Sequence, residues 1–580
     1  MTAYLEVASS LTGRRWVGPS SEVERQAEAI AQATDLPDVL TRVLAARGVL
    51  AQDANAFLAP SLRDLMPDPL SLKDMDKASA RIFTALQANQ RIAIFADYDV
   101  DGATSAAQLL IWFKALGVEA TLYIPDRLKE GYGPNNAAME TLGKAHDLII
   151  CVDCGTVAIG PVQIAVDQGA DVIILDHHLG EETLPPALAV VNPNRQDETS
   201  EHTYLCAAGV VFLTLVAVNR HYREAGISAP PLMDMLDLVA LGTVADVAPL
   251  VGFNRALVRQ GLTVMASRSR PGLVALGDVA KINTAPRAYH LGYLLGPRIN
   301  AGGRIGKATL GTRLLTATEP HEAEALAERL NELNGERREI EATVQAAAEA
   351  QAEDRGLDGP LVWAAGKGWH PGVVGIVASR LKEKFNRPAV VIGISEEGVG
   401  HGSGRSVGGV DLGAAISKLA RDGIILKGGG HKMAAGLSVT ETDIEAAMAA
   451  LSSALGKQGA GNVGPRDLAI TAAIGGATPE LIEQIEAAGP FGAGAPAPRF
   501  AIPSARIRFA KPAGESHLRL TVDNGGGPID IIAFRAFESE LGQALLNHAG
   551  QAFHFVGRLE IDEWGGRRKA KMQLEDASKA

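Results

Sequence analysis

The chain of 580 residues is too long to fold around one hydrophobic core, and its length predicts roughly three or four domains. Its 47% hydrophobic content excludes a disordered chain, and the absence of a run of about 18 apolar residues predicts no membrane span. The N-terminal stretch lacks the pattern of a secretory signal. The three cysteines are too few for a disulfide framework, so we expect a cytoplasmic protein.

The net charge of −12 argues at first sight against a nucleic-acid partner, but a cluster of metal-binding carboxylates would contribute to the same acidic excess. The charge therefore does not decide between these classes of ligand. Cys151 and Cys154 form a C-x-x-C pair at the end of an apolar run, with no second pair of cysteines or histidines nearby. That context favours a structural role over zinc binding or redox chemistry.

In chain order, residues 1–75 are predicted to form a mainly helical N-terminal region. From residue 91 onward, short apolar runs alternate with helical patterns, which predicts a parallel, doubly wound α/β sheet. We expect strands at 91–96, 119–124, 147–152 and 171–175, and largely helical structure over 205–265. The first α/β domain should span 76–317.

An apolar stripe at three-, four- and seven-residue spacings predicts one long helix, which we expect to connect two domains over 318–357. A second, smaller and glycine-rich α/β domain is expected over 358–456. After it come several short strand-like segments separated by glycine turns, which predict a C-terminal β-barrel over 457–580, most naturally an OB-fold.

Acids and histidines follow three of the predicted strands. The segment FADYDVDG (95–102) places three aspartates directly after an apolar run, where bound metal ions, nearby Lys and Arg, or solvent must offset their repulsion. The carboxyl ends of parallel strands share one sheet edge, where ligands bind. A lone aspartate after a strand is as often a helix N-cap, but three such ends together favour a metal site. The candidates, including one acid in the mostly apolar segment 240–250, are Asp97, Asp99, Asp101, Asp153, Asp176, His177, His178 and Asp246.

This donor set predicts the metal and the chemistry. Carboxylates suit hard cations, and a minority of imidazole shifts the preference from Mg²⁺ toward Mn²⁺. The set is large enough to hold two ions that share a bridging carboxylate, an arrangement that clamps the attacking and leaving oxygens of a phosphoryl displacement. The residues therefore predict phosphodiester hydrolysis that depends on two divalent metal ions, Mn²⁺ or Mg²⁺.

Four segments resemble the motifs of the DHH phosphoesterase superfamily: FADYDVDG, VDCG (152–155), LDHH (175–178) and GTVADVAPL (242–250). Five further segments narrow the resemblance to the RecJ family of single-stranded-DNA-specific exonucleases. They lie at 124–133, 295–306, 366–381, 402–406 and 428–436. The resemblance extends from about residue 35 to 575. It departs at Ala495, where the family usually has Asn in a turn.

The resemblance implies a 5′-to-3′ exonuclease that degrades single-stranded DNA to 5′-mononucleotides in DNA recombination and repair. One metal would be held by Asp97, Asp99 and Asp153. The other would be held by Asp101, Asp153, His177 and Asp246, with Asp153 bridging. His178 would lie beside the scissile phosphate, as an electrostatic stabiliser or proton donor. The catalytic residues would therefore be Asp153, His177 and His178.

The resemblance also implies how DNA is held. Arginine forks and glycine-exposed N–H groups suit phosphate, and we expect one group of residues to hold the terminal 5′-phosphate and its neighbours, with Tyr132 stacking on a base. The expected contacts are Arg127, Tyr132, Arg298, Asn300, Arg304, Ser403, Arg405 and His431. On the barrel, Phe509, Phe534, Phe555, Trp564 and the basic cluster 567–569 would grip the strand further along, unless they fill the barrel core or form a solvated turn.

Two other functions stay open. One is a DHH phosphodiesterase for short oligonucleotides, although such relatives usually lack a C-terminal barrel. The other is a non-catalytic scaffold that binds single-stranded DNA, although the ligand set here is complete. The expected partners are single-stranded DNA with a 5′-phosphate, a RecQ-type helicase and a single-strand-binding protein. We expect a monomer without membrane contact.

Overall fold

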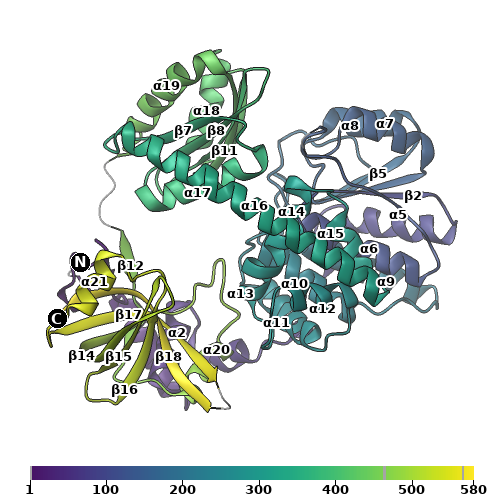
Figure 1. Cartoon of the computed structure of the whole chain (residues 1–580). Coiled ribbons are helices and arrows are strands. Elements are labelled where there is room, and N and C mark those ends of the chain that lie inside the picture. Colours follow the sequence, from purple (N-terminus) through teal and green to yellow (C-terminus); the bar gives the residue numbers. More distant parts are fainter. Residues whose placement is uncertain (1–2, 128, 462–465, 565–566) are drawn as a thin grey trace.

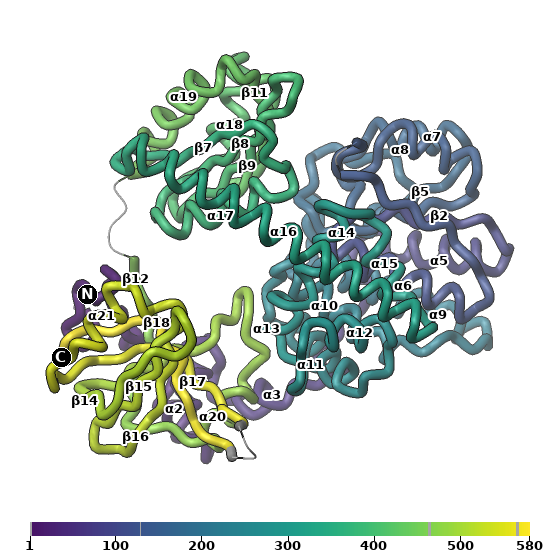
Figure 2. The backbone as a smooth tube through the Cα atoms, in the orientation of Figure 1, coloured from purple at the N-terminus to yellow at the C-terminus, as the bar shows by residue number. Residues whose placement is uncertain are grey.

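The computed structural model describes residues 3–580 apart from 128, 462–465 and 565–566. Figures 1 and 2 show three bodies: a large α/β body, a smaller α/β body joined to it by one long helix, and a β-barrel that carries both chain termini. Within the described residues, no helix is both long and apolar enough to cross a membrane.

The large body is built on a five-stranded parallel sheet in the order β3-β2-β4-β5-β6. All five residues of β2 and of β4 are buried, as is typical of a parallel sheet covered on both faces. The four predicted strands are confirmed, and β6 was not predicted. The strands are β2 (Ile92–Ala96), β3 (Thr121–Tyr123), β4 (Leu148–Val152), β5 (Asp171–Leu175) and β6 (Ala189–Val191).

Helices cover both faces of this sheet. Ile94 and Ile150 point into a core with α5, α6 and α9, while Phe95 and Cys151 point into a second core with α7 and α8. This alternation explains why two of the cysteines lie buried, as structural residues. The helices are α5 (Met75–Gln87), α6 (Val100–Ala115), α7 (Asn136–Ala145), α8 (Ile159–Asp167) and α9 (Ala207–Glu224).

A helical layer follows the sheet and leads into the long helix α16 (Pro320–Asp354), which confirms the predicted connecting helix. Leu330 of α16 belongs to the core of this layer, whereas Val344 belongs to the core of the smaller α/β body, so one helix joins both. The layer consists of α10 (Leu236–Ala245), α11 (Gly252–Ala266), α12 (Pro271–Val279), α13 (Ala288–His290), the π-helix η5 (Leu291–Leu295), α14 (Gly296–Ile305) and α15 (Leu310–Thr316), preceded by η4 (Met233–Met235).

The smaller body has a mixed five-stranded sheet in the order β10-β11-β9-β8-β7, in which only β7 and β8 are parallel. The C-terminal part of α16 and the helices α17, α18 and α19 pack against it. Its elements are β7 (Val362–Lys367), α17 (Pro371–Phe385), β8 (Ala389–Ile394), β9 (Val399–Arg405), α18 (Leu412–Arg421), β10 (Lys427–His431), β11 (Ala434–Thr440), η6 (Glu441–Asp443) and α19 (Ile444–Gly456).

The barrel confirms the predicted OB-fold architecture. Its strands follow the order β14-β15-β16-β18-β17, and β17 pairs again with β14, so the sheet closes on itself. The predicted run of short strands separated by glycine turns is confirmed by these strands. The elements are β12 (Asp467–Ala469), β13 (Ala472–Ala473), α20 (Pro479–Ala487), β14 (Phe500–Ala513), β15 (His517–Asp523), β16 (Pro528–Ala533), α21 (Glu540–Leu546), β17 (Ala552–Trp564) and β18 (Arg567–Lys579).

The N-terminal region as far as α3 (Ala54–Leu58) belongs to the barrel body, which the sequence did not predict, whereas α4 (Leu62–Leu65) and η3 (Pro69–Ser71) pack against α11 and α9 of the large body. Ile30 and Leu44 share a core with Phe555 of the barrel, and Trp16 donates a hydrogen bond from Nε1 to buried Asp576 at 2.9 Å. The region is mainly helical as predicted, but it contains a strand that pairs in parallel with β12. Its elements are η1 (Tyr4–Glu6), β1 (Arg15–Val17), α1 (Ser21–Ala33), α2 (Asp38–Ala46), η2 (Ala51–Asp53), α3 (Ala54–Leu58), α4 (Leu62–Leu65) and η3 (Pro69–Ser71).

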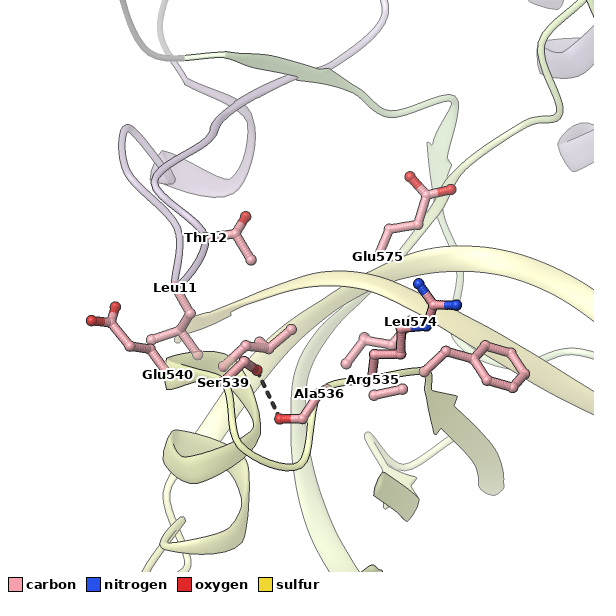
Figure 3. A pocket seen from close by; sticks show the side chains of 11 residues that line it. Leu11, Thr12, Arg535, Ala536, Ser539, Glu540, Leu574 and Glu575 are labelled. Atoms are coloured by element: carbon pink, nitrogen blue, oxygen red, sulfur yellow. Dashed lines mark hydrogen bonds between the residues drawn. The ribbon is translucent and has the colours of Figure 1, made fainter. Parts of the chain in front are cut away.

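A cavity of about 310 Å³ marks this junction between the N-terminal region and the barrel. Figure 3 shows Leu11 and Thr12 on one side of it, and the residues around the start of α21 on the other, where the Ser539 hydroxyl donates to the Ala536 carbonyl at 2.7 Å. Two acids line it, Glu540 and Glu575, and Glu575 is ion-paired with Arg499 and Arg558. Among its described lining residues, the cavity therefore offers no free carboxylate cluster.

Candidate active site

The predicted acids and histidines lie together at the carboxyl edge of the parallel sheet. Asp97 follows β2, Asp153 follows β4 and His177 follows β5, while Asp246 comes from the end of α10. Atoms within 4.8 Å of one another form three groups that could hold a metal ion. The groups are Asp97, Asp99 and Asp153; Asp101, His177 and Asp246; and Asp153, His177 and His178.

Local backbone structure fixes the first motif. Asp99 is the N-cap of α6, where its Oδ1 accepts hydrogen bonds from the N–H groups of Asp101 at 2.8 Å and Gly102 at 3.1 Å. Gly102 packs so tightly that a Cβ there would lie 2.4 Å from the Asp97 carbonyl oxygen. The capping alternative is therefore correct for Asp99. Its second carboxylate oxygen stays available to the site, so capping and metal binding are compatible.

Asp101 and Asp153 are held in the interior. Both Asp101 oxygens accept backbone N–H groups at the start of α9, from Ala207 at 2.7 Å and Ala208 at 2.8 Å. Asp153 adopts φ 58°, a left-handed conformation that is unfavourable for a residue with a Cβ. Such strain persists where the surrounding structure enforces it and is concentrated at functional sites.

His177 lies between Asp153 on one side and Asp101 and Asp246 on the other. Its Nε2 lies 3.2 Å from Asp153 Oδ1 and 3.7 Å from Asp101 Oδ2, and its Nδ1 lies 3.7 Å from Asp246 Oδ2. The histidine therefore contacts the acid that was predicted to bridge two metals and both remaining acids of the second metal group.

Three buried atoms of this cluster form no hydrogen bond within the described part of the chain: Asp97 Oδ1, Asp153 Oδ1 and His177 Nε2. Burial, reinforced by the charges of neighbouring carboxylates, raises the pKa of Asp97 and of Asp153 well above the ordinary aspartate value. The same causes raise the pKa of Asp246 to about 9. Buried acceptors without donors and crowded carboxylates are what divalent cations stabilise. The residues therefore fit a metal centre.

His178 is oriented by Asp176, which was among the candidate acids but was given neither a metal nor a catalytic role. Nδ1 of His178 lies 2.8 Å from Asp176 Oδ1, and Asp176 also accepts hydrogen bonds from the N–H and hydroxyl of Thr156. Burial disfavours the imidazolium, but the bond to Asp176 and the surrounding acids raise the pKa of His178 to about 9. These contacts therefore favour the protonated imidazole in the metal-free protein.

Tyr132 lies over this histidine. Its hydroxyl donates to the Asp153 carbonyl at 3.0 Å and lies 3.2 Å from His178 Nε2, and its ring packs edge-on against Tyr98. The side chain is 49% exposed. Its ring packs edge-on against His178, and stacking on a base stays a prediction.

A cavity of about 360 Å³ lies between the two α/β bodies. It brings together four of the predicted DNA contacts, because Arg127 and Arg304 come from the large body and Ser403 and Arg405 from β9 of the smaller one. Arg304 donates to the Gly372 carbonyl at 2.8 Å, and Arg405 donates to Ser403 Oγ at 3.0 Å. The remaining lining residues, which were not predicted, are Pro371, Gly375, Ile376, Ser379, Arg380 and Glu383.

The other predicted contacts lie outside this cavity. Arg298 donates to Asn331 of α16 at 3.0 Å, and Asn300 Oδ1 accepts the Val100 N–H at 3.1 Å, so both stabilise the packing around the first motif. His431 is exposed at the end of β10, whose glycines pair with β11 and do not form a tight turn.

On the barrel, Phe555 is fully buried in the core, whereas Phe509 and Phe534 are about half exposed. Arg568 is ion-paired with Glu483 and Glu563, so it is not a free cation. The side chains of Trp564 and Arg567 lie outside the described part of the chain. Ala495, where the sequence departs from the expected motif, is buried against the large body and pairs with Gly492 in a tight turn.

Three family descriptions match successive parts of the chain. The DHH family, N-terminal domain, matches residues 91–243, the DHHA1 domain matches 358–457, and the RecJ OB domain matches 469–576. The single-stranded-DNA-specific exonuclease RecJ of Dickeya dadantii is 36% identical over 93% of this chain and 97% of its own length. The protein of the same name from Escherichia coli is 35% identical over 93% and 96%.

The structure resembles solved structures over nearly its whole length. The crystal structure of RecJ from Thermus thermophilus in complex with Mn²⁺ aligns with a TM-score of 0.80 and 29% identity, and covers 97% of this chain and 79% of that one. The Mg²⁺ complex of the same protein aligns with a TM-score of 0.74. The chain belongs to the RecJ family of single-stranded-DNA-specific exonucleases.

Proposed function

We propose that this chain is a 5′-to-3′ exonuclease that hydrolyses single-stranded DNA to 5′-mononucleotides, with two divalent metal ions, Mn²⁺ or Mg²⁺. The observation that carries the proposal is the acid cluster at the sheet edge, in which three buried polar atoms form no hydrogen bond to any described residue. The names of the relatives and the two metal complexes of the Thermus protein support the same activity.

We assign one metal to Asp97, Asp99 and Asp153, and the other to Asp101, Asp153, His177 and Asp246. When bound, the ions would activate water and offset the charge of the reacting phosphate. The carboxylates that the helix N-cap and the α9 N–H groups fix in place need little rearrangement to bind them. Replacement of the residues that hold either metal should therefore slow the chemical step before it weakens DNA binding.

We expect the His178 side chain to act directly on the reacting phosphate. The hydrogen bond to Asp176 raises the pKa of His178 and favours the protonated ring, which can stabilise a phosphate oxygen or protonate the leaving 3′-oxygen. Asp176 holds Nδ1, and the Tyr132 hydroxyl lies 3.1 Å from Nδ1 and 3.2 Å from Nε2, so both neighbours fix the position of the ring. We infer that Tyr132 positions the terminal nucleotide over this edge.

The direction of digestion follows from the cavity between the bodies. Arg127, Arg304, Ser403 and Arg405 converge there, and none of the three arginines forms an ion pair within the described residues. We infer that they bind the 5′-phosphate, which places the next phosphodiester bond at the metal centre. A strand end is thus recognised before the bond beside it is cut.

An end-labelled oligonucleotide tests this proposal. With Mn²⁺ or Mg²⁺, a 5′-labelled single strand should release labelled mononucleotide at once, a 3′-labelled strand should shorten progressively, and EDTA should stop both. Initial release from the 3′-labelled strand would reverse the assigned direction. Tight binding without cleavage would favour the scaffold function instead.

We further propose action in DNA recombination and repair, a cytoplasmic location, a monomeric state, and cooperation with a RecQ-type helicase and a single-strand-binding protein. The family supports these assignments. The proposed domain bounds are those predicted above, with the N-terminal region as far as α3 and the barrel packed as one body.

A further inference from the structure

The cavity between the two α/β bodies extends well beyond the place of one phosphate group. We call the end of the cavity that Arg304, Ser403 and Arg405 line its catalytic end. Gly375 of α17 lies against this end, where an added Cβ would be 3.0 Å from Ser403 Oγ and 3.2 Å from Arg405 Nη2. From there the lining continues along the same helix face to Ser379 and Glu383, one residue per turn. These eight residues of helix correspond to about 12 Å.

The cavity carries more positive charge than one phosphate requires. Arg127, Arg304, Arg380 and Arg405 line it, and among the described lining residues Glu383 is the single acid. Arg380 has one partner within the described residues, Glu341, at 3.6 Å, and its side chain is 54% exposed. Burial and the nearby charge of Arg127 lower the pKa of Arg304 and Arg405, so these guanidinium groups are incompletely neutralised by the protein.

The volume of the cavity, like its charge, is larger than one phosphate group requires. At about 360 Å³ the cavity lies within the range of about 300–1,000 Å³ that is usual for sites binding whole small molecules. Arg304, Ser403 and Arg405 at the catalytic end suffice for one phosphate. Ser379 and Arg380 lie further along α17, and Glu383, which is 3.8 Å from Lys382, bounds the far end.

We propose that this cavity accepts a 5′-triphosphate as well as a 5′-monophosphate, with Ser379 and Arg380 contacting the phosphates beyond the first. The inference rests on the proposed exonuclease function. Water would attack the phosphorus of the second nucleotide, the bond from that phosphorus to the 3′-oxygen would break, and the 3′-oxygen would take a proton. The first product would therefore be a nucleoside triphosphate, followed by mononucleotides.

The test compares one single-stranded DNA sequence with a 5′-monophosphate and with a 5′-triphosphate, in the presence of Mn²⁺, with chromatographic identification of the first product. We expect the full-length protein to release a nucleoside triphosphate at a rate within about tenfold of mononucleotide release. In Arg380→Ala the ratio of the triphosphate rate to the monophosphate rate should fall by about tenfold, the effect of losing a charge-assisted hydrogen bond.

Lys384→Ala is the matched control, because Lys384 is a cation of the same helix that pairs with Glu349 and Glu353 and lies outside the cavity lining. Its ratio should equal that of the wild type. The inference is overturned if the wild type cuts the triphosphate strand more than about a hundredfold more slowly, if pyrophosphate is released first, or if Arg380→Ala leaves the ratio unchanged. Failure on both strands would overturn the proposed function as well.

Discussion

His178 is bound through Nδ1 to Asp176 Oδ1 at 2.8 Å, and Asp176 is fully buried beneath it. Asp176 receives four further hydrogen bonds, from the N–H groups of residues 156, 177 and 178 and from the Thr156 hydroxyl. Burial opposes ionisation, but these bonds and the charge of His178 hold the pKa of Asp176 well below its ordinary value. The carboxylate thus stays charged and orients the imidazole.

Replacement of this orienting acid should slow the chemical step. In Asp176→Asn, His178 loses the neighbouring carboxylate charge that raises its pKa, and its ring is no longer held in one tautomer. We expect the turnover number to fall by about a hundredfold or more, by analogy with other acid–histidine pairs. The pH–rate profile should lose the limb near pH 9 that His178 produces.

A control separates orientation from folding. The DNA affinity of Asp176→Asn should stay close to the wild type, whereas its melting temperature should fall, because the amide NH₂ replaces an oxygen that accepts hydrogen bonds. The turnover numbers are therefore compared at a temperature at which both proteins are fully folded. Unchanged turnover with an unchanged pH profile would show that His178 needs no such partner.

Metal removal should make the protein sensitive to alkaline pH. The pKa of Asp246 is about 9 in the metal-free fold, against about 3.9 in an unfolded chain. Between these values the folded state binds more protons than the unfolded state, so the free energy of unfolding falls as pH rises. We expect the melting temperature in EDTA to be lower at about pH 8.5 than at about pH 6, and added Mn²⁺ to restore it.

Asp246→Asn should flatten this dependence, since it removes the titrating group. Glu515→Gln, at an exposed barrel turn, should not. Equal slopes of melting temperature against pH for Asp246→Asn and the wild type would contradict the assignment of a raised pKa to this acid.

Arg405 should govern recognition of the 5′ end. Arg405→Ala removes a guanidinium from the cavity, so the rate on 5′-phosphorylated DNA should fall by about tenfold or more while the rate on a 5′-hydroxyl strand changes little. The ratio of the two rates is the measurement. Arg421→Ala, at the exposed end of α18 and outside the cavity lining, should keep the wild-type ratio. A wild-type ratio in Arg405→Ala would remove Arg405 from the end-binding site.

The strands that position the acids could be predicted because each is a run of four or five apolar residues followed by an aspartate. β6 escaped prediction because three apolar residues give too short a signal. The pairing of β1 with β12 joins residues 452 positions apart, which no local pattern encodes. Ser379 and Arg380 were not predicted to line the cavity for a similar reason. The length and packing of α16 determine which part of the large body α17 faces, and no local pattern encodes this.

The role of Asp99 shows a different limit. Its position after a strand allowed both a helix cap and a metal ligand, and one oxygen forms the cap while the other stays available. Arg298 and Asn300 carry the residue types expected of DNA contacts, yet their side chains bond to Asn331 and to the Val100 N–H. Residue type alone could not distinguish packing from binding there.

The most direct test of the two-metal site is Mn²⁺ binding and DNA cleavage by Asp153→Ala, measured together. The wild type should bind two ions per chain and cleave, whereas the variant, which lacks the carboxylate shared by both groups, should lose at least one ion and all detectable cleavage while it still binds single-stranded DNA. Two bound ions with wild-type cleavage in Asp153→Ala would contradict the account.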